Sequence, residues 1–553
     1  MALGKRILIV GGVAGGASCA ARARRLSEDS EIILFEKGPF VSFANCGLPY
    51  HIGDVIQKED SLMVATPGLF KKRFNVDVRL NSEVISIDRQ ANEVAVKDLT
   101  TGNVYSEKYD ALVLSPGAAP VKPPIPGIDL PGIFTLRNVP DTRQIKQWIA
   151  KCVSRRALVV GGGFIGLEMT ENLVKLGMSV TLVEAMPQVM PLLDAEMVSP
   201  VHEELKKQGV SLRLGDSVKS FEQMPDGSIR AGLQSGAEEN GDIVILSIGV
   251  RPEAKLARDA GLEIGELGGI RVDDGMQTSD PKIWAVGDAV EVRDFITGRW
   301  ALIPLAGPAN RQGRIAADVI MGRDRRFRGT QGTAVCGVFE VTIASTGPSE
   351  KTLKRFGIWR EEYEKIYLHP SHHASYYPGA APISLKLIFS RDGGKIIGCQ
   401  AVGKQGVEKR VDVISMAIQN HATVFDLEEA ELCYAPQYGS AKDPVNMAGM
   451  IASNVLRGDS ALAQWEEVAD TPAFVLDVRE PKEFERGHLE QAVNIPLGQL
   501  RSRMDELPKD REILTYCLVG QRSYYASRML ANHGFKARTI SGGYKTFSSR
   551  KAK

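Results

Sequence analysis

One pattern occurs twice in this chain and restricts its fold more than any other feature. It consists of a short apolar strand, a glycine-rich loop, a helix, a second strand and an acidic residue. In the first copy, the strand Arg6–Val10 leads into the loop 11–16 and a helical pattern to about Leu26, and the second strand, 32–35, ends at Glu36. Uninterrupted β-branched runs stopped by glycine are typical of buried parallel strands.

The second copy keeps the same order. Strand 157–160 leads into the loop 161–166, a helix runs through Leu176, and strand 180–183 ends at Glu184. Each copy is a strand–helix–strand unit, which places its two strands in parallel in one sheet. The sequence therefore predicts an α/β fold built around two such units.

The glycines of the two loops suit dinucleotides. In such loops the first glycine allows a tight turn, the second lets the backbone approach a pyrophosphate, and the third lets the helix pack on the strand. The second loop has all three, namely Gly161, Gly163 and Gly166. The first has Gly11 and Gly16, with Val13 in the middle position. Because phosphate binds where free N–H groups point out of a helix N-terminus, two loops predict two dinucleotides.

The acids at the ends of the second strands, Glu36 and Glu184, suit ribose. A carboxylate at this position accepts hydrogen bonds from ribose hydroxyls. At Glu184 it would repel a 2′-phosphate, and residues 185–187 contain no compensating arginine. We therefore expect NADH rather than NADPH at the second loop.

Composition excludes several classes of protein. The chain has 553 residues and a formal net charge of +1, so no global field argues for nucleic acid or a membrane as partner. No apolar run is long enough to span a membrane. The seven cysteines lack the spacing of a disulfide framework or zinc site, and His369, His372 and His373 lack a carboxylate or cysteine motif beside them. We expect a cytoplasmic protein without a metal.

Three further motifs resemble those of two-dinucleotide flavoproteins. They lie at 114–117, 247–252 and 278–288, and the last ends in Asp288. In that family the final aspartate binds the ribityl chain of FAD. The resemblance implies two sets of cofactor-binding residues: Gly11, Gly16, Glu36 and Asp288 for FAD, and Gly161, Gly163, Gly166 and Glu184 for NADH.

Cys46 distinguishes this chain among such flavoproteins. Glutathione-reductase-like enzymes carry a second cysteine in the next helical turn, where this chain has His51. A lone cysteine works as a thiolate, or through a mixed disulfide or persulfide. Segments 11–16, 42–50, 373–379 and 434–438 closely resemble coenzyme A-disulfide reductases, and the likeness covers roughly residues 5–450.

That resemblance implies roles for further residues. Cys46 is expected to attack the sulfur bound to coenzyme A. Tyr376 and Tyr434 are expected to reach the site from the other subunit of a homodimer, where a phenol stabilises or protonates the leaving thiolate. The coenzyme A path is expected to include Ser18, Arg22, Arg25, Ser42, Asn45, Lys71, Asn310, Arg311 and Lys442. Basic side chains suit a ligand with three phosphates.

Some positions depart from the family pattern. Arg22 stands where a family member has glutamine, Asn310 where one has histidine, and Phe74 replaces a lysine. NADH oxidases and peroxidases, which are close cousins, carry a histidine at the position of Ala14. Without that acid/base group, peroxide chemistry is the weaker alternative.

The last part of the chain resembles a rhodanese domain, at 477–479, 487–489, 492–496, 517–522 and 541–544. The strand Ile513–Tyr516 leads to Cys517, and the loop closes at Arg522, where a helix starts. Backbone N–H groups then surround the sulfur as an anion site. Phosphatases of this fold use a loop one residue longer, so the resemblance implies sulfur transfer by Cys517 and Arg522. A non-catalytic binding module is the alternative, and Asp477 and Arg479 are expected to be structural.

These motifs divide the chain into domains. We expect an FAD-binding domain at 1–118 and 250–328, an NADH-binding domain at 119–249, a dimerisation domain at 329–455, a linker at 456–467 and a rhodanese domain at 468–553. The expected fold class is thus α/β: two Rossmann-like domains, an α+β dimerisation domain and an α/β rhodanese domain. Strands at 383–389 and 396–402 are expected in the dimerisation domain.

Together the two cysteines lead to one main hypothesis. Cys517 would deliver sulfane sulfur, and Cys46, recharged by NADH through FAD, would reduce the S–S bond of a persulfide, a polysulfide or coenzyme A persulfide and release hydrosulfide. The alternative is a coenzyme A-disulfide reductase with an accessory rhodanese domain. Lesser alternatives are an NADH oxidase or peroxidase, and a redox or sulfur sensor.

Overall fold

The computed structural model describes residues 4–359, 361–469 and 471–551. The chain forms two compact units, residues 1–187 with 209–332 and residues 188–208 with 333–553. Helix α6 (Ala195–Lys207), which the sequence places in the NADH-binding domain, therefore groups with the second unit. Among the described residues, no helix is long and apolar enough to cross a membrane.

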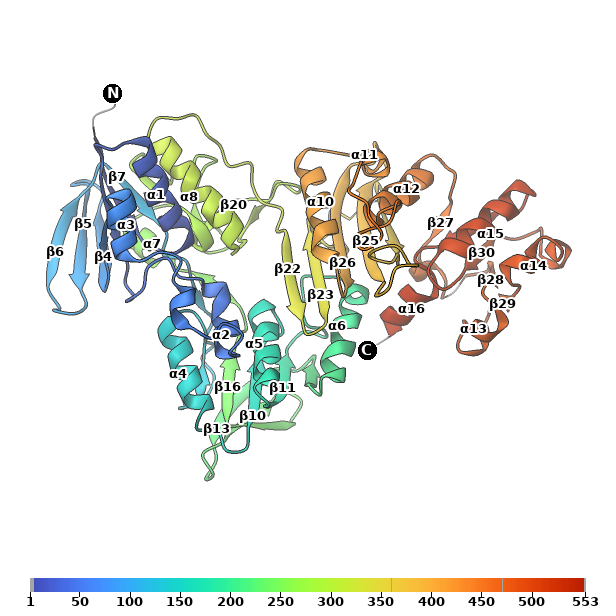
Figure 1. Cartoon of the computed structure of the whole chain (residues 1–553), viewed down its shortest axis with the longest axis horizontal. Helices are drawn as coiled ribbons and strands as arrows, with labels where there is room; N and C mark the ends of the chain where they lie inside the picture. Colours follow the sequence, from blue (N-terminus) through green and yellow to red (C-terminus); the bar gives the residue numbers. More distant parts are fainter. Residues whose placement is uncertain (1–3, 360, 470, 552–553) are drawn as a thin grey trace. The chain divides into compact units, whose positions relative to one another are not determined.

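The first repeated unit forms a five-stranded parallel sheet. Its strands, in the order β19-β7-β1-β2-β3, are Ile283–Ala285, Ala111–Leu114, Arg6–Val10, Glu31–Phe35 and Asp77–Arg79. Helices α1 (Ala14–Leu26) and α8 (Ala306–Ile320) pack against each other beside it (Figure 1). Burial of β1 explains its uninterrupted apolar sequence.

The second repeated unit forms another five-stranded parallel sheet. Its strands, in the order β12-β11-β10-β16-β9, are Ser211–Leu214, Ser179–Glu184, Arg156–Val160, Ile243–Leu246 and Ile133–Phe134. Helix α5 (Phe164–Lys175) follows its glycine loop. The predicted strands and helices of both units are confirmed, with ends shifted by at most three residues.

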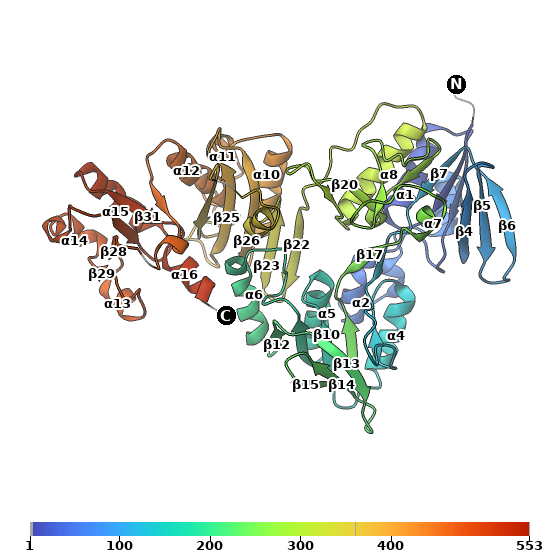
Figure 2. The ribbon, with the colours of Figure 1, turned by 180° about the vertical axis from the view of Figure 1, so that it is seen from behind.

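Each of these sheets is accompanied by a small antiparallel sheet. The first comprises β4 (Ser82–Asp88), β5 (Glu93–Asp98) and β6 (Val104–Lys108). The second comprises β13 (Val218–Gln223), β14 (Ile229–Leu233) and β15 (Glu238–Gly241), and β15 packs against β10 (Figure 2). The two nucleotide domains thus share one plan.

A short helical segment connects the two nucleotide domains. The 3-10 turn η1 (Asn45–Gly47) holds Cys46 and runs into α2 (Leu48–Ile52), which packs against α5 and α4 (Val139–Ile149). The apolar side chains of α2 share one core with those of the second nucleotide domain. This packing fixes Cys46 beside both glycine-loop domains.

The second unit contains an antiparallel sheet. Its strands, in the order β22-β23-β26-β25-β24, are Ala334–Val338, Val341–Thr346, Ile396–Gly403, Ile383–Ser390 and Tyr363–Leu368. The predicted strands 383–389 and 396–402 are confirmed as β25 and β26. Helices α10 (Val407–Gln419), α11 (Val424–Glu429) and α12 (Pro444–Leu456) follow, and α6 packs on the sheet.

The chain ends in a parallel sheet. Its strands, in the order β27-β31-β30-β28-β29, are Leu462–Ala463, Ala537–Ile540, Ile513–Tyr516, Phe474–Asp477 and Val493–Asn494. Helices include α13 (Pro481–Glu485), α14 (Leu497–Leu500), α15 (Gln521–Asn532) and α16 (Gly543–Lys551). The expected linker, 456–467, contains β27 and the buried Trp465, whose ring packs in the core of this domain.

Polar contacts join this last domain to the antiparallel sheet. The Tyr367 amide donates to Ser541 Oγ at 3.0 Å, and His369 Nε2 lies 2.9 Å from Thr546 Oγ1. Lys365 Nζ lies 2.7 Å from Glu466 Oε1. The last domain is thus attached to β24 by hydrogen bonds and an ion pair, and α16 packs against α6.

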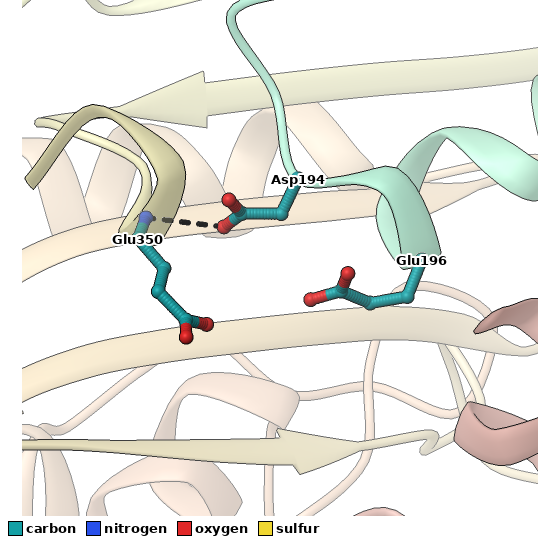
Figure 3. Close-up of side chains that lie close together, drawn as sticks. All are labelled: Asp194, Glu196 and Glu350. Atoms are coloured by element: carbon teal, nitrogen blue, oxygen red, sulfur yellow. Dashed lines mark hydrogen bonds between the residues drawn. The ribbon is translucent and has the colours of Figure 1, made fainter. Parts of the chain in front are cut away.

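Three carboxylates, Asp194, Glu196 and Glu350, lie close together next to the antiparallel sheet. Their oxygens are within 4.8 Å of one another (Figure 3). The ammonium of Lys386 lies 2.9, 2.8 and 2.7 Å from these three groups, in that order. Burial alone would raise the pKa of Glu350, but Lys386 and Lys365 lower it overall. The cluster is therefore an internal ion-pair network, in which the Lys386 ammonium occupies the place that a metal ion would need.

Candidate active site

The first glycine loop holds a carboxylate at its mouth. Glu36 accepts hydrogen bonds from the amides of Gly12 and Gly38, at 2.9 and 2.8 Å. Burial raises the pKa of Glu36, and these two bonds offset this only in part. A Cβ on Gly16 would come within 1.9 Å of the Gly11 carbonyl oxygen, so the helix can approach the loop only with glycine there.

The second loop repeats this geometry. Glu184 accepts hydrogen bonds from the amides of Gly162 and Met186, at 2.6 and 2.8 Å. A Cβ on Gly166 would lie 1.9 Å from the Gly161 carbonyl oxygen, whereas a Cβ on Gly163 would meet nothing within 4 Å. The start of α5 therefore leaves open space where a pyrophosphate would approach the backbone.

Cys46 lies in the turn before α2. Its Sγ is accessible and lies 3.7 Å from Asn45 Oδ1. Burial raises the pKa of the Cys46 thiol, and the negative charges of Glu168 and Asp288 raise it further. The protein by itself thus favours the thiol over the thiolate, so a bound molecule must supply compensating charge or accept the proton.

The carboxylate of Asp288 is available to accept hydrogen bonds from a ligand. It lies in the 3-10 turn η3 (Gly287–Ala289), and burial raises its pKa. No described residue donates a hydrogen bond to this carboxylate. A half-buried carboxylate without a donor suits a ligand hydroxyl, as the FAD resemblance requires.

Glu168 is a residue that the sequence analysis missed. It lies on α5, and burial raises its pKa to about 7. The Tyr50 hydroxyl donates to its Oε1 at 3.4 Å, and Tyr50 lies on α2, the helix next to Cys46. Its position two residues after Gly166, at the start of the nucleotide helix, is the signal that would have identified it.

The structure brings together part of the expected coenzyme A path. Ser18 on α1 donates to Asn310 Oδ1 on α8 at 2.5 Å. The Nε and Nη2 groups of Arg22 donate to Oδ1 of the buried Asp318, at 3.0 and 2.7 Å. The positive charge of Arg22 is therefore already neutralised within the protein.

The other expected residues of this path make different contacts or belong to different elements. Lys71 on α3 (Pro67–Phe74) contacts Asn75, and the Arg311 guanidinium lies 5.8 Å from the Phe327 ring centroid. Arg25, Ser42 and Asn45 belong to the same unit, and Ser42 has a left-handed φ of 49°. Lys442 belongs to the second unit.

Tyr376 and Tyr434 form a pair in the second unit. Their hydroxyls lie 2.8 Å apart, and this hydrogen bond raises the pKa of Tyr376. The two side chains are 74% and 49% exposed. Because aromatic side chains exposed to this extent commonly mark contact surfaces, the pair suits an interface with a second subunit.

Buried polar contacts hold the two loops that carry these tyrosines. Arg410 is bonded to the His372 carbonyl oxygen at 2.6 Å and to Asp443 Oδ2 at 2.8 Å. The Ala374 amide donates to the Gly439 carbonyl oxygen at 2.9 Å. The hydroxyl pair is thus preorganised by the fold of one chain.

The second thiol, Cys517, lies at the end of β30. Its side chain is buried, and the Gly520 amide donates to Sγ at 3.2 Å. Gly520 adopts a left-handed φ of 97°, which turns its N–H toward the sulfur. The Arg522 guanidinium forms two 2.7 Å bonds with Glu483. A backbone N–H donor directed at the sulfur suits an anionic form of it.

A buried ion pair supports this loop. Asp477 and Arg479 are bonded at 2.6 Å and are almost fully buried. The Arg479 guanidinium also donates to the Gly487 carbonyl oxygen at 2.8 Å and lies 4.5 Å from the Tyr544 ring centroid. The Tyr544 amide donates to the Cys517 carbonyl oxygen at 2.7 Å. Through these contacts the pair stabilises the Cys517 loop, in agreement with a structural role.

Comparison with family models identifies three regions. Residues 5–313 match the pyridine nucleotide-disulphide oxidoreductase family, and residues 333–443 match its dimerisation domain. Residues 460–550 match the rhodanese-like domain. The fold class expected from the sequence is thereby confirmed.

Individual relatives cover most of the chain. The coenzyme A disulfide reductase of Staphylococcus epidermidis is 37% identical over 445 residues, which span 80% of this chain and 99% of that protein. The structure of reduced CoADR-RHD from Bacillus anthracis is 49% identical with a TM-score of 0.96, covering 99% of this chain and 98% of that one. The NAD-dependent persulfide reductase from A. fulgidus is 37% identical with a TM-score of 0.90, covering 98% and 100%. With half of its length matched by the family model and these relatives spanning it, the chain belongs to the pyridine nucleotide-disulfide oxidoreductase family.

Proposed function

We propose that this protein is an NADH-dependent flavoprotein that reduces the S–S bond of a persulfide, a polysulfide or coenzyme A persulfide and releases hydrosulfide. One observation carries the proposal: a single chain holds two different thiol sites, an accessible Cys46 beside both glycine-loop domains and a buried Cys517 that accepts from the Gly520 amide. The relatives named for coenzyme A disulfide reduction and for persulfide reduction support it.

The residues present fit the two cofactors. FAD would be held by Gly11, Gly16, Glu36 and Asp288, and NADH by Gly161, Gly163, Gly166 and Glu184. The free carboxylate of Asp288 and the open space beside Gly163 support this assignment. When bound, FAD would supply the route by which the electron pair of NADH reaches the sulfur of Cys46. Glu184, which already faces its loop, favours NADH over NADPH.

Cys46 would perform the reductive half of the reaction. Its thiolate attacks the coenzyme A-bound sulfur of a coenzyme A persulfide, forms a mixed disulfide with coenzyme A and expels hydrosulfide. With FAD bound, the electron pair of NADH would reduce that mixed disulfide, so that Cys46 would return as thiolate and coenzyme A would leave as a thiol. Each cycle consumes one NADH and releases one hydrosulfide.

The tyrosine pair would handle the proton of the leaving coenzyme A. With its pKa raised by the hydrogen bond to Tyr434, Tyr376 stays protonated and can donate to a thiolate. Its exposure leads us to propose that the pair serves the Cys46 site of the other subunit in a homodimer. The coenzyme A path would run along Ser18, Arg22, Arg25, Ser42, Asn45, Lys71, Asn310, Arg311 and Lys442.

Cys517 would supply the sulfur. Its thiolate takes the outer sulfur of a donor persulfide and releases the donor thiolate, with Arg522 and the Gly520 amide stabilising the new Cys517 persulfide. A coenzyme A thiolate then takes that sulfur, which restores Cys517. The contacts at Ser541 and Thr546 favour a carrier molecule moving between the sites over a swinging domain.

A coenzyme A-disulfide reductase with an accessory rhodanese domain is the second candidate, and it rests on the Staphylococcus relatives.

We place the protein in the cytoplasm, since none of its cysteines is paired and a reducing compartment suits a reactive thiol.

Anaerobic NADH oxidation separates the two candidates. The purified protein receives polysulfide or coenzyme A disulfide as sole acceptor, and sulfide release is recorded in parallel. Turnover with polysulfide, with one sulfide per NADH, is the expected result. Turnover with coenzyme A disulfide alone, without sulfide, would establish the second candidate in its place.

A further inference from the structure

The outer face of α15 carries a hollow of about 530 Å³. We call it the α15 hollow; its walls include Arg501, Tyr524, Tyr525, Arg528 and His533. Its size lies in the range typical of small-molecule sites. No acidic side chain contributes to its lining. The residues that the mechanism uses, Cys517 and Arg522, lie outside it.

Two arginines give the α15 hollow a positive charge that the rest of the protein compensates only weakly. Arg501, which follows α14, is exposed, and no described carboxylate pairs with it. Arg528 has one acidic neighbour, Asp459, at the long distance of 3.8 Å. Planar guanidinium groups bind phosphate through paired hydrogen bonds. Two arginines with so little internal compensation therefore suit a ligand with more than one phosphate.

The rings of the α15 hollow suit a base. Tyr525 is 48% exposed, and its hydroxyl accepts from Gln521 Nε2 at 3.0 Å. The Tyr524 ring centroid lies 5.8 Å from that of Tyr525, and its hydroxyl is 3.4 Å from Asn454 Nδ2. Hydrogen bonds thus orient both rings while about half of the Tyr525 side chain stays exposed. Open tyrosine faces are stacking platforms for purines.

The α15 hollow lies on the helix that directly follows the Cys517 loop. Helix α15 begins at Gln521, directly after Gly520, which donates to the sulfur. At about 1.5 Å of rise per residue, Arg528 lies roughly 10 Å further along the helix axis. An extended phosphopantetheine arm is long enough to cover this distance.

We propose that the α15 hollow binds the adenosine 3′,5′-bisphosphate end of a coenzyme A molecule, whose thiol then collects sulfur from Cys517. This would be a second coenzyme A site, distinct from the path that leads to Cys46. The proposal rests on the proposed function, because it assigns the acceptor of the Cys517 sulfur. It explains why a rhodanese domain would carry two weakly compensated arginines beside an exposed tyrosine ring.

The test compares two acceptors of sulfur from thiosulfate, using the full-length protein without NADH. Coenzyme A carries the nucleotide that the α15 hollow would bind, and cyanide does not. The variant Arg501→Ala/Arg528→Ala should raise the KM for coenzyme A by roughly tenfold to a hundredfold. Its transfer to cyanide should stay unchanged, which also shows that the variant folds. Adenosine 3′,5′-bisphosphate should compete with coenzyme A and not with cyanide.

The matched control is Lys509→Ala/Arg511→Ala, which removes the same charge from exposed residues of this domain outside the hollow. The proposal is overturned if the control raises the KM for coenzyme A as much as the hollow variant does. It is also overturned if adenosine 3′,5′-bisphosphate fails to compete. If the unaltered protein transfers no sulfur even to cyanide, the proposed role of Cys517 fails, which is a different result.

Discussion

The guanidinium of Arg410 lies 2.8 Å from the carboxylate of Asp443, and both side chains are almost fully buried. Arg410 also binds the His372 carbonyl oxygen, so this ion pair ties the loop of Tyr376 to the loop of Tyr434. Asp443 in addition caps α12 by accepting from the Val445 amide at 3.1 Å. One buried pair thus positions two exposed phenols.

Replacing Asp443 by alanine should destabilise the protein strongly. The change leaves the Arg410 charge buried without a partner, and breaking such a pair costs about 3–5 kcal/mol. Denaturant unfolding followed by fluorescence measures the loss. The control is Asp259→Ala, which breaks an exposed pair with Lys255 and should cost at most about 1 kcal/mol. Equal losses in the two variants would show that the Arg410–Asp443 pair is not a structural support.

The two cysteines should separate under substitution. Cys46→Ser should lower NADH-dependent turnover with every sulfur acceptor by roughly a thousandfold or more, because the attacking thiolate is gone. Cys517→Ser should keep turnover with coenzyme A disulfide and lose sulfur transfer from thiosulfate to cyanide. Steady-state assays on both acceptors measure this. Cyanide transfer that survives in Cys517→Ser would remove Cys517 from the mechanism.

Glu168 should make the reactivity of Cys46 depend on pH. Its carboxyl ionises as the pH rises through about 7, and the resulting charge raises the pKa of Cys46. Glu168→Gln removes that charge, so the midpoint of Cys46 alkylation by iodoacetamide should fall by roughly half a unit to one unit. Glu171→Gln, on the same helix, is the control and should not speed alkylation.

The same carboxyl affects stability. Folding raises the pKa of Glu168 from 4.5 to about 7, so the folded protein holds this proton more tightly than the unfolded chain. Its contribution to stability is complete below pH 4.5 and is lost as the pH rises through 7. Glu168→Gln should remove this loss, and unfolding measured at pH 5 and pH 8 tests it. An unchanged difference between the two pH values would contradict the assignment.

Lys386 should be essential to the carboxylate cluster of Figure 3. Lys386→Met leaves two buried carboxylates and the half-buried Glu196 close together with Lys365 as the remaining partner of Glu350, which should cost about 3–5 kcal/mol. Lys404→Met, which removes an exposed partner of Glu340, is the control. Calcium should raise the melting temperature of Lys386→Met more than that of the unaltered protein, since the ammonium then no longer fills the cluster. A stable Lys386→Met variant would argue against the network.

Much of the fold followed from local patterns. The two glycine loops, the acids Glu36 and Glu184 and the strand before Cys517 lie within short segments, and period and turn chemistry report on such segments directly. Other relationships join distant segments, as when Glu168 meets Tyr50 or Arg410 meets Asp443. No local pattern in a single sequence encodes such pairings, so the sequence analysis missed them.

The sequence by itself determined the order of the domains, the two nucleotide loops and the two thiols, because each depends on residues that are neighbours in the chain. The tertiary structure decided the rest. It grouped α6 with the antiparallel sheet, neutralised Arg22 with Asp318, and joined Ser541 to β24 and Thr546 to His369. These outcomes depend on which buried charges and hydrogen-bonding groups find partners across long sequence separations, and only the packed chain fixes those partners.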